Sequence, residues 1–309
     1  MTAPSPPPAP PAPDRLAERT ARVRAVLDDR YPSWAVGPLT PVGAGLDAAV
    51  FRAPTAAFGE VAIRVPWARW ISNDNDRALD ARALLAKEEL LANHLHAHGV
   101  PTPRAFALHR GDDDLDFLVS AYVPDDDSAE DPAALGAVVR AIHAAPVEPA
   151  IAAALADGPL ADTIATRLVE RLAVVGRLAG APVAAPPVDA LRAALAGARY
   201  QPCVLHMDVR RTNIRTAAGA IRAIFDWSNA LLGDPALELA RAAEYGVRPA
   251  AFDAGYGPLP PVSALVDTIY RLDTAVMLAV VFLSEDPDPA AAVRQVARVH
   301  ALLGALERA

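Results

Sequence analysis

Hydrophobic residues follow two different periods in the first third of the chain. Residues 15–29 carry leucine, valine and alanine at helical spacing, which predicts a helix with one apolar face. Short apolar segments then follow, broken by glycine and proline, as is typical of β-strands joined by tight turns. These predicted strands are residues 39–43, 49–53 and 61–65.

A long helix and two further strands complete this part of the chain. The apolar positions of residues 80–98 recur at helical spacing, and Gly99 followed by prolines provides a stop signal. Two later segments again have the pattern of strands. They are residues 104–109 and 116–123. We therefore expect a small α+β unit at residues 15–124.

An acidic stretch at residues 125–131 separates this unit from a second part, residues 125–309, in which helical patterns dominate. The predicted helices include residues 235–245, 262–283 and 289–306. A β feature interrupts them, with predicted strands at residues 203–205, 214–216 and 220–225. The pattern thus predicts an α+β protein with a small β-rich lobe and a larger helical lobe. Residues 1–14 are rich in proline, which lacks a backbone donor, and are expected to form a disordered tail.

Composition narrows the class of protein. The chain has 309 residues, 53% of them hydrophobic, which suffices for a buried core. Its net charge of -8 argues against a nucleic-acid partner, because binding a phosphate backbone needs clustered positive charge. We find no apolar segment long enough to span a bilayer and no secretory signal, so we expect a cytoplasmic protein without a membrane partner. The lone Cys203 is expected to be a small buried hydrophobe, and the oligomeric state is left open.

The strongest chemical signal surrounds the predicted strands of the second part. His206, Asp208 and Asn213 form the pattern H-x-D-x-x-x-x-N, and an Asp-Trp pair at Asp226 follows the next two strands. A tight turn around Gly219 would pair those strands and bring Asn213 close to Asp226. An amide and a carboxylate suit Mg²⁺, which also takes oxygens from substrate phosphates. Asp208 would then be free to deprotonate an acceptor hydroxyl, although turn capping is the plainer alternative for all three.

This ordered set, followed by Gly233, Asp234 and Pro235, resembles the aminoglycoside phosphotransferase and choline kinase family. The resemblance extends over about residues 39–245. It implies a bilobal, protein-kinase-like fold, with ATP as the phosphate donor and Mg²⁺ as the cofactor. In the pattern of that family, Asp208 is the catalytic base, whereas Asn213 and Asp226 bind magnesium.

The same resemblance assigns nucleotide-binding residues in the first lobe. Gly43 and Gly45 lie in a turn between two predicted strands, where backbone N–H groups can approach phosphates because no Cβ intrudes. Arg64 stands where kinases have a phosphate-pairing lysine, and arginine keeps the charge on a longer, planar group. Glu88 on the following helix is its expected partner, with Glu89 as the neighbouring alternative.

Other positions qualify the resemblance. Ser228 stands where many relatives carry an acid, and Met207 stands where glycine is commoner. His143 resembles a recurrent helix end of the family and is expected to be structural, because it lies on a packed helix. In similar proteins the backbone of the segment at residues 117–123 binds the adenine as the chain crosses between the lobes.

Four functions compete as explanations of this sequence. A protein kinase would need a long activation segment, but only residues 227–233 separate Asp226 from Asp234. A pseudokinase that acts as a nucleotide-binding interaction module would be expected to lack one of the three site residues. Adenylyl transfer on the same scaffold would be distinguished by its nucleotide product. The best supported hypothesis is that the chain is an ATP-dependent small-molecule kinase.

The acceptor is expected to be a small hydroxylated compound, such as an aminoglycoside-like antibiotic, a sugar or an amino alcohol. A cationic or polyhydroxylated acceptor is favoured, because many acids are expected on the large-lobe side of the site. Ordinary solvated surface is the alternative for these acids. They lie in residues 125–131 and at Asp267, Asp273, Glu285, Asp286 and Asp288.

Overall fold

The computed structural model describes residues 13–45, 47–76, 78–112 and 115–308. Most of the proline-rich segment predicted as a tail therefore lies outside the described residues. The first helix, α1 (Pro13–Arg30), begins inside the predicted tail. Proline is tolerated there because the first turn of a helix has no use for its missing N–H.

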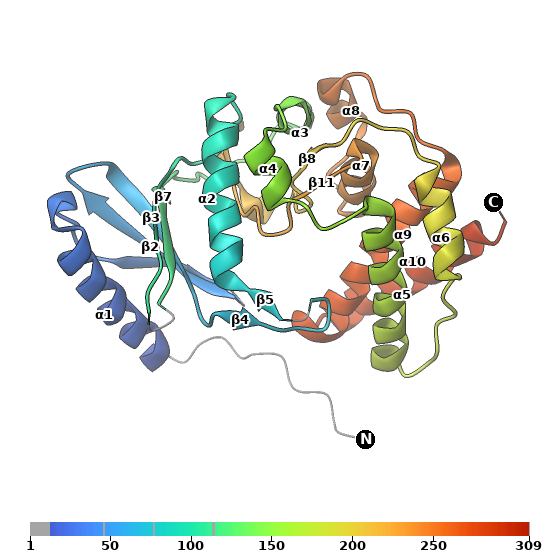
Figure 1. Cartoon of the computed structure of the whole chain (residues 1–309), viewed down its shortest axis with the longest axis horizontal. Coiled ribbons are helices and arrows are strands. Elements are labelled where there is room, and N and C mark those ends of the chain that lie inside the picture. Colours follow the sequence, from blue (N-terminus) through green and yellow to red (C-terminus); the bar gives the residue numbers. More distant parts are fainter. Residues whose placement is uncertain (1–12, 46, 77, 113–114, 309) are drawn as a thin grey trace.

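The first lobe is a five-stranded antiparallel sheet with a helix on each face (Figure 1). The strands in spatial order are β1 (Thr40–Ala44), β2 (Ala48–Thr55), β3 (Gly59–Pro66), β7 (Phe117–Ala121) and β6 (Ala105–His109). Every predicted strand of this lobe is present, as is the predicted helix, α2 (Ala81–Ala97). A short 3-10 turn, η1 (Pro32–Trp34), follows α1.

Alternation along the strands decides which helix covers which face. Phe51, Ile63 and Val119 are fully buried in the same cluster as Val23 and Leu27 of α1. Successive side chains of a strand point to opposite faces, so Arg64, next to Ile63, lies on the other face. That face is the one against which Leu85 of α2 packs.

An excursion between β3 and α2 reaches across to the second lobe. The chain forms a two-residue ladder between β4 (Trp70–Ile71) and β5 (Leu79–Asp80), and we call residues 72–76 between them the strap. The backbone N–H of Asn75 donates to Glu285 Oε1 at 2.9 Å, and Asp76 pairs with Arg171 at 3.3 Å. Figure 1 shows this segment running from the sheet to the helices of the other lobe.

The second lobe is mainly helical. Its helices are α3 (Pro132–Ala144), α4 (Pro149–Ala154), α5 (Leu160–Ala179), α6 (Val188–Ala196), α7 (Pro235–Glu244), α8 (Ala250–Tyr256), α9 (Ala264–Val280) and α10 (Pro289–Leu306). The three helices predicted individually are present, but α9 ends earlier than expected and continues as a π-helical turn, η3 (Val281–Glu285). Buried residues of α5, α6, α7, α9 and α10 form one core.

The predicted β feature of this lobe is present, with a partner that the pattern did not reveal. The hairpin joins β9 (Ile214–Ala217) to β10 (Ala220–Ile224), and Gly219 has a φ of +78° in its turn. β8 (Cys203–Leu205) pairs instead with β11 (Leu231–Gly233). Cys203 is buried, and burial raises the pKa of its thiol to about 12, so the expectation of an inert hydrophobe is confirmed.

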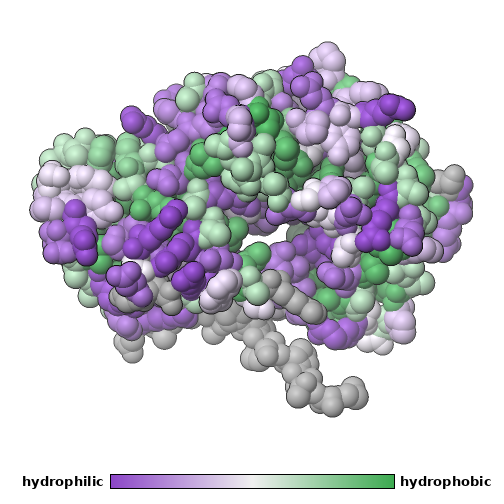
Figure 2. Space-filling model, in the orientation of Figure 1, coloured by the Kyte–Doolittle hydropathy of each residue, from purple (hydrophilic) through white to green (hydrophobic). Residues whose placement is uncertain are grey.

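The two lobes leave the molecule hollowed between them. Figure 2 shows this opening with hydrophilic residues along its border. Among the described residues, none of the helices combines the length and the apolar character that crossing a membrane requires.

Candidate active site

The loop after β8 carries the first group of site residues. The ring of His206 is fully buried: its Nδ1 accepts from the backbone N–H of Asp208 at 3.1 Å, so its Nε2 donates to the Phe225 carbonyl at 3.0 Å. Met207 has a φ of +64°, a left-handed conformation that glycine adopts without strain, which explains why glycine is commoner at this position. The loop therefore needs to be held in place from outside.

Glu238 of α7 supplies that support. Its carboxylate accepts from the backbone N–H groups of Met207 at 2.6 Å and His206 at 3.1 Å, and from His143 Nε2 at 2.7 Å. Burial by itself would raise the pKa of Glu238, but His143 and the other donors outweigh it and hold the pKa below its usual value. His143 packs against Tyr256, as expected of a structural residue. Through Glu238 it is also connected to the loop after β8.

Asp208 is buried and oriented by three donors. Asn213 Nδ2 donates to Oδ2 at 2.7 Å, and the Tyr245 hydroxyl donates to Oδ1 at 2.9 Å. Arg210 Nε lies 3.1 Å from the same carboxylate. Arg241 in turn donates to the Tyr245 hydroxyl at 3.1 Å, which fixes the tyrosine. The Asp208 carboxylate is thereby aimed by groups from the loop and from the end of α7.

The second group of residues joins the two lobes. Arg64 Nη1 lies 2.6 Å from Glu88 Oε2 and 3.1 Å from Asp226 Oδ1, so one nitrogen bridges α2 and the segment after β10. Asp226 has a φ of +68°, and its Oδ1 also accepts from Ser228 Oγ at 2.6 Å. The expected contact between Arg64 and Glu88 is therefore present, whereas the alternative partner Glu89 has no part in it.

These contacts separate the pKa values of the two acids. Burial alone would raise the pKa of Asp226, but Arg64 and Ser228 outweigh it and lower the pKa to about 2. Burial also raises the pKa of Glu88, and there Arg64 offsets only part of the effect because the negative charge of Asp226 is close. Asp226 is thus the acid that stays ionised at any working pH.

The glycine turn differs in detail from the expectation. Neither Gly43 nor Gly45 has side-chain or backbone atoms crowding the place of a Cβ, so the turn leaves room for a ligand. The Gly45 N–H, however, is used within the turn, where it donates to the Ala48 carbonyl at 2.9 Å. Asp47 in the same turn faces Arg64 and Asp226, and burial raises its pKa. No sequence motif pointed to this carboxyl group.

Asn213 and Asp226 have the chemistry of a Mg²⁺ site, although the protein offers few ligands. Both amide hydrogens of Asn213 face Asp208, through bonds to its carboxylate and its carbonyl, so the amide oxygen points away from them. Asp226 adds an ionised carboxylate. Among the described residues, no three carboxylate, histidine or cysteine side chains converge on a point. This set fits Mg²⁺ that completes its coordination with phosphate oxygens and water.

Several of the acids on which the expectation of a cationic acceptor rested have partners within the protein. Asp125 pairs with Arg211 and accepts from Thr216, and Asp273 is fully buried against Arg167. Asp267 pairs with Arg271 within α9, and Asp288 caps α10. Glu285 accepts from the strap. These five side chains therefore contribute to the fold, and a cationic acceptor stays a prediction that they do not support.

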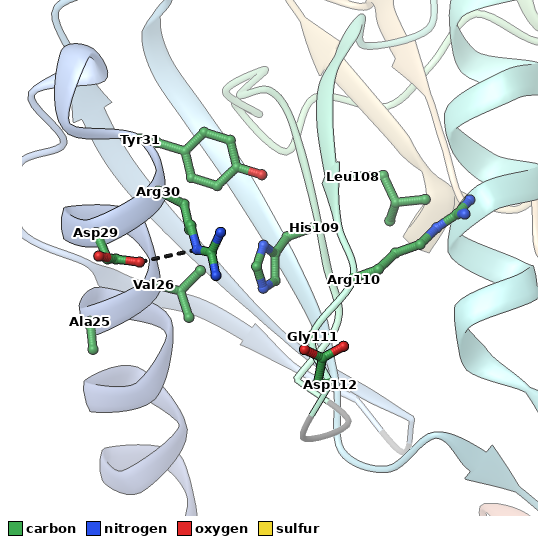
Figure 3. Close-up of a pocket in the computed structure, with 10 residues that line it drawn as sticks. All are labelled: Ala25, Val26, Asp29, Arg30, Tyr31, Leu108, His109, Arg110, Gly111 and Asp112. Carbon is green, nitrogen blue, oxygen red and sulfur yellow. Dashed lines mark ion pairs between the residues drawn. The ribbon is translucent and has the colours of Figure 1, made fainter.

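A groove of about 780 Å³ lies elsewhere, between α1 and the end of β6 (Figure 3). Tyr31 and His109 face each other across it, and Arg30 on its rim pairs with Asp29 at 3.0 Å. Because α1 covers the face of the sheet opposite to Arg64, this groove is separate from the cluster described above.

Comparisons with known proteins agree with this geometry. The model of the phosphotransferase enzyme family matches residues 38–259. No match was found among curated proteins.

Solved structures share the fold at low sequence identity. Wild-type aminoglycoside 2'-phosphotransferase-IIIa in its GDP complex is 15% identical with a TM-score of 0.61, covering 92% of this chain and 98% of that one. A ternary complex of an aminoglycoside phosphotransferase, APH(4)-Ia, with ADP and hygromycin B is 17% identical with a TM-score of 0.61, covering 91% and 97%. A choline/ethanolamine kinase family protein from Mesorhizobium loti is 20% identical with a TM-score of 0.60, covering 92% and 95%. The chain therefore belongs to the phosphotransferase enzyme family and has the bilobal, protein-kinase-like fold of these small-molecule kinases.

Proposed function

We propose that this protein transfers the γ-phosphate of ATP to a hydroxyl group of a small molecule, with Asp208 as the catalytic base. The observation that carries this proposal is that Asn213 contacts Asp208 and that its carbonyl accepts from the N–H of Phe225, next to Asp226, while Arg64 contacts Asp226. Turn capping, the plainer alternative, is less satisfactory because Asp208 accepts from the Tyr245 hydroxyl at the end of α7 in addition to groups of its own loop.

The chain's own residues have clear tasks in this reaction. The acceptor oxygen attacks the γ-phosphorus while the bond from that phosphorus to the β–γ bridging oxygen breaks, which releases ADP. Asp208 takes up the acceptor proton, and Tyr245 and Asn213 keep its carboxylate aimed at the acceptor. Asn213 and Asp226 would hold Mg²⁺, which neutralises charge on the phosphates when it is bound. Arg64, held by Glu88, would add positive charge beside them.

The lobes divide this work. We propose that residues 15–124 bind the nucleotide and that residues 125–309 supply the catalytic loop and the acceptor site. The glycine turn at Gly43 and Gly45 would cover the phosphates, and the backbone after β7 would receive the adenine. Two solved structures with this fold are complexes with GDP and with ADP, which supports the use of a nucleotide. They do not decide between ATP and GTP as the phosphate donor.

The acceptor is proposed to be a hydroxylated small molecule. A structural relative holds hygromycin B together with ADP, which supports a hydroxylated small molecule as the acceptor. Because several of the candidate acids are engaged in ion pairs and caps, we propose a polyhydroxylated acceptor, and the acceptor panel below tests whether it is also cationic.

A product-resolved assay tests this function. Purified protein is incubated with ATP or GTP, Mg²⁺ and panels of sugars, amino alcohols and aminoglycosides, and nucleotide products are separated by chromatography. We expect ADP or GDP to form only with a productive acceptor, which gains one phosphate by mass. AMP as the product would indicate adenylyl transfer instead. Nucleotide binding without turnover across the panel would favour the pseudokinase.

A further inference from the structure

The chain has a single lysine, Lys87, whereas its other strongly basic side chains are arginines. Lys87 lies in α2 immediately before Glu88, and its side chain is partly buried at the lobe junction. Nζ donates to the backbone carbonyls of Ser228 at 2.5 Å and Ala230 at 3.2 Å. Both carbonyls belong to the segment that begins at Asp226.

Neighbouring side chains of α2 thus hold opposite sides of the junction. Glu88 contacts Arg64 on β3 of the first lobe, whereas Lys87 contacts the segment at residues 228–230 of the second. That segment needs support, because Asp226 is a non-glycine residue with a φ of +68°. Ser228 connects the two ends of the arrangement: its carbonyl accepts from Lys87 and its hydroxyl donates to the Asp226 carboxylate.

The side-chain type also fits this task. Two carbonyl oxygens converge on one atom, and a compact ammonium with three donors can serve both, whereas a planar guanidinium is bulkier and directional. Burying this cation is unfavourable, as the lowered pKa of Lys87 indicates. The acids that face it and favour its charged form are Asp157, Asp226, Glu88 and Asp76.

We propose that Lys87 is a positioning residue that, through Ser228, fixes the Asp226 carboxylate for the metal–nucleotide complex. This inference rests on the proposed function, because it presumes that Asp226 holds Mg²⁺ beside the phosphates. In this proposal, α2 positions the metal-binding segment directly through Lys87. It also holds Arg64, on the nucleotide side of the site, through Glu88.

Calorimetry without any acceptor tests the proposal. ADP is titrated into the protein with Mg²⁺ and again with EDTA, for wild type, Lys87→Met and Lys87→Arg. A lost charge-assisted hydrogen bond corresponds to about a tenfold change, so we expect Lys87→Met to weaken Mg²⁺-dependent binding about tenfold and binding in EDTA less than twofold. Lys87→Arg should recover part of the loss. Glu89→Gln, on the same helix, is the matched control and should bind as wild type.

A second measurement uses the unmodified protein, in case the Lys87 variants fail to fold. Acylation of the single ε-amine by an amine-reactive reagent is followed by mass spectrometry, with the N-terminal amine resolved as a separate peptide. We expect Mg²⁺–ADP to slow acylation of Lys87 several-fold relative to ADP with EDTA, because the bound complex holds the 226–230 segment closed.

The outcomes separate the two hypotheses. Equal Mg²⁺-dependent binding in wild type and Lys87→Met, or an acylation rate unaffected by Mg²⁺–ADP, would overturn the role of Lys87 while leaving the phosphotransferase intact. Equal loss of binding with Mg²⁺ and with EDTA would reduce Lys87 to a general structural residue and also overturn it. A wild-type protein that binds no nucleotide at all would overturn both.

Discussion

The role that we propose for Asp208 depends on the groups that surround its carboxylate. The carboxylate receives hydrogen bonds from Asn213 and Tyr245, and these donors come from different elements. Such a group is aimed in advance, which is what a general base needs in order to meet an acceptor hydroxyl in one orientation. The pattern H-x-D-x-x-x-x-N contains Asn213 but says nothing of Tyr245 or of Arg241 behind it.

Replacing Asp208 by Asn should remove the base and keep its shape. We expect kcat to fall about 10²–10⁴-fold with the nucleotide KM within a few-fold of wild type, because the phosphate contacts remain. Coupled ADP detection with a productive acceptor measures both constants. Asp189→Ala, which removes an exposed carboxylate of α6, should leave both unchanged. Near-normal turnover of Asp208→Asn would remove this residue from the proposed role.

Asp226 and Asn213 should differ in their effect on magnesium. Asp226→Asn removes a carboxylate whose pKa is about 2, whereas Asn213→Ala removes only a neutral amide oxygen. We expect the Mg²⁺ concentration for half-maximal activity to rise about tenfold or more in Asp226→Asn and by less in Asn213→Ala. Titration of Mg²⁺ at saturating nucleotide measures it. Unchanged Mg²⁺ dependence in both variants would contradict the assignment.

Substitution of Arg64 tests whether it occupies the position of the phosphate-pairing lysine of kinases. Because one nitrogen makes both of its contacts, an ammonium group could in principle serve them as well. We expect Arg64→Ala to raise the nucleotide KM about tenfold while the acceptor KM changes less than threefold, and Arg64→Lys to recover most of the loss. Initial-rate kinetics at varied nucleotide and acceptor separate the two. A larger effect on the acceptor KM would place Arg64 outside the nucleotide site.

At the scale of elements, α7 organises the loop from outside the motif. Glu238 and Arg241 lie on this helix and Tyr245 follows it, so intervals of three and four bring all three to one face of the helix. The sequence predicted this helix, and polar residues at helical spacing directly after the Gly-Asp-Pro signature were a usable signal. Their partners were not predictable, because the contact with β8 and its following loop depends on how distant segments pack.

Glu238→Gln should destabilise the fold in a pH-dependent manner. The folded-state pKa of Glu238 lies below its usual 4.5, so its stabilisation is fully present above about pH 4.5 and is lost as pH falls through the lower folded value. We expect Glu238→Gln to lower the free energy of unfolding by about 2–4 kcal/mol at pH 7, with a smaller difference from wild type below pH 4.5.

Denaturant unfolding at pH 7 and pH 4 measures this difference. Glu170→Gln, at an exposed position of α5, is the matched control and should lie within about 0.5 kcal/mol of wild type at both values. A difference between wild type and Glu238→Gln that stays constant between the two pH values would show that the charge of Glu238 is not what holds the loop.

At the scale of the whole molecule, the sequence predicted the two lobes but not how they are joined. Hydrophobic spacing predicts strands and helices locally. The tight turn expected around Gly219 predicted that Asn213 would approach Asp226. The strap, in contrast, has short polar residues and two-residue strands, which carry no periodic signal. Its position depends on contacts more than 90 residues away in the chain, such as those of Asp76 with Arg171 and of Asn75 with Glu285.

The strap joins the lobes at a place apart from the covalent connection after β7 and from the contacts of Arg64 and Lys87 (Figure 1). Asp74 pairs with Arg177, Asp76 with Arg171, and Glu285 accepts from Asn75. Arg171 also lies 4.0 Å from Asp273. Burial lowers the pKa of Arg171, and the positive charges of Arg167 and Arg241 lower it further. The strap is therefore connected through charged neighbours to the side of the molecule where Tyr245 meets Asp208, which we propose to be the acceptor side.

Weakening the strap should therefore affect the acceptor more than the nucleotide. The double variant Asp76→Ala/Glu285→Ala removes its contacts with Arg171 of α5 and with η3, while leaving Arg64, Glu88 and the glycine turn in place. We expect the acceptor KM to rise about tenfold and the nucleotide KM to change less than threefold, because these contacts position the strap on the side that we propose for the acceptor. Initial-rate kinetics measure both, and hydrogen exchange should show faster exchange in residues 72–76.

A matched double variant separates this effect from a general loss of ion pairs. Asp162→Ala/Asp189→Ala removes two contacts of Arg192, both 2.9 Å long and both within the second lobe. These are exposed pairs, which contribute little, so the kinetic constants should stay as in wild type. If the strap variant instead raised both KM values equally, the strap would set the separation of the lobes as a whole. If it raised neither while exchange accelerated, its contacts would be irrelevant to acceptor binding, and the acceptor would have to be held by residues of the second lobe alone.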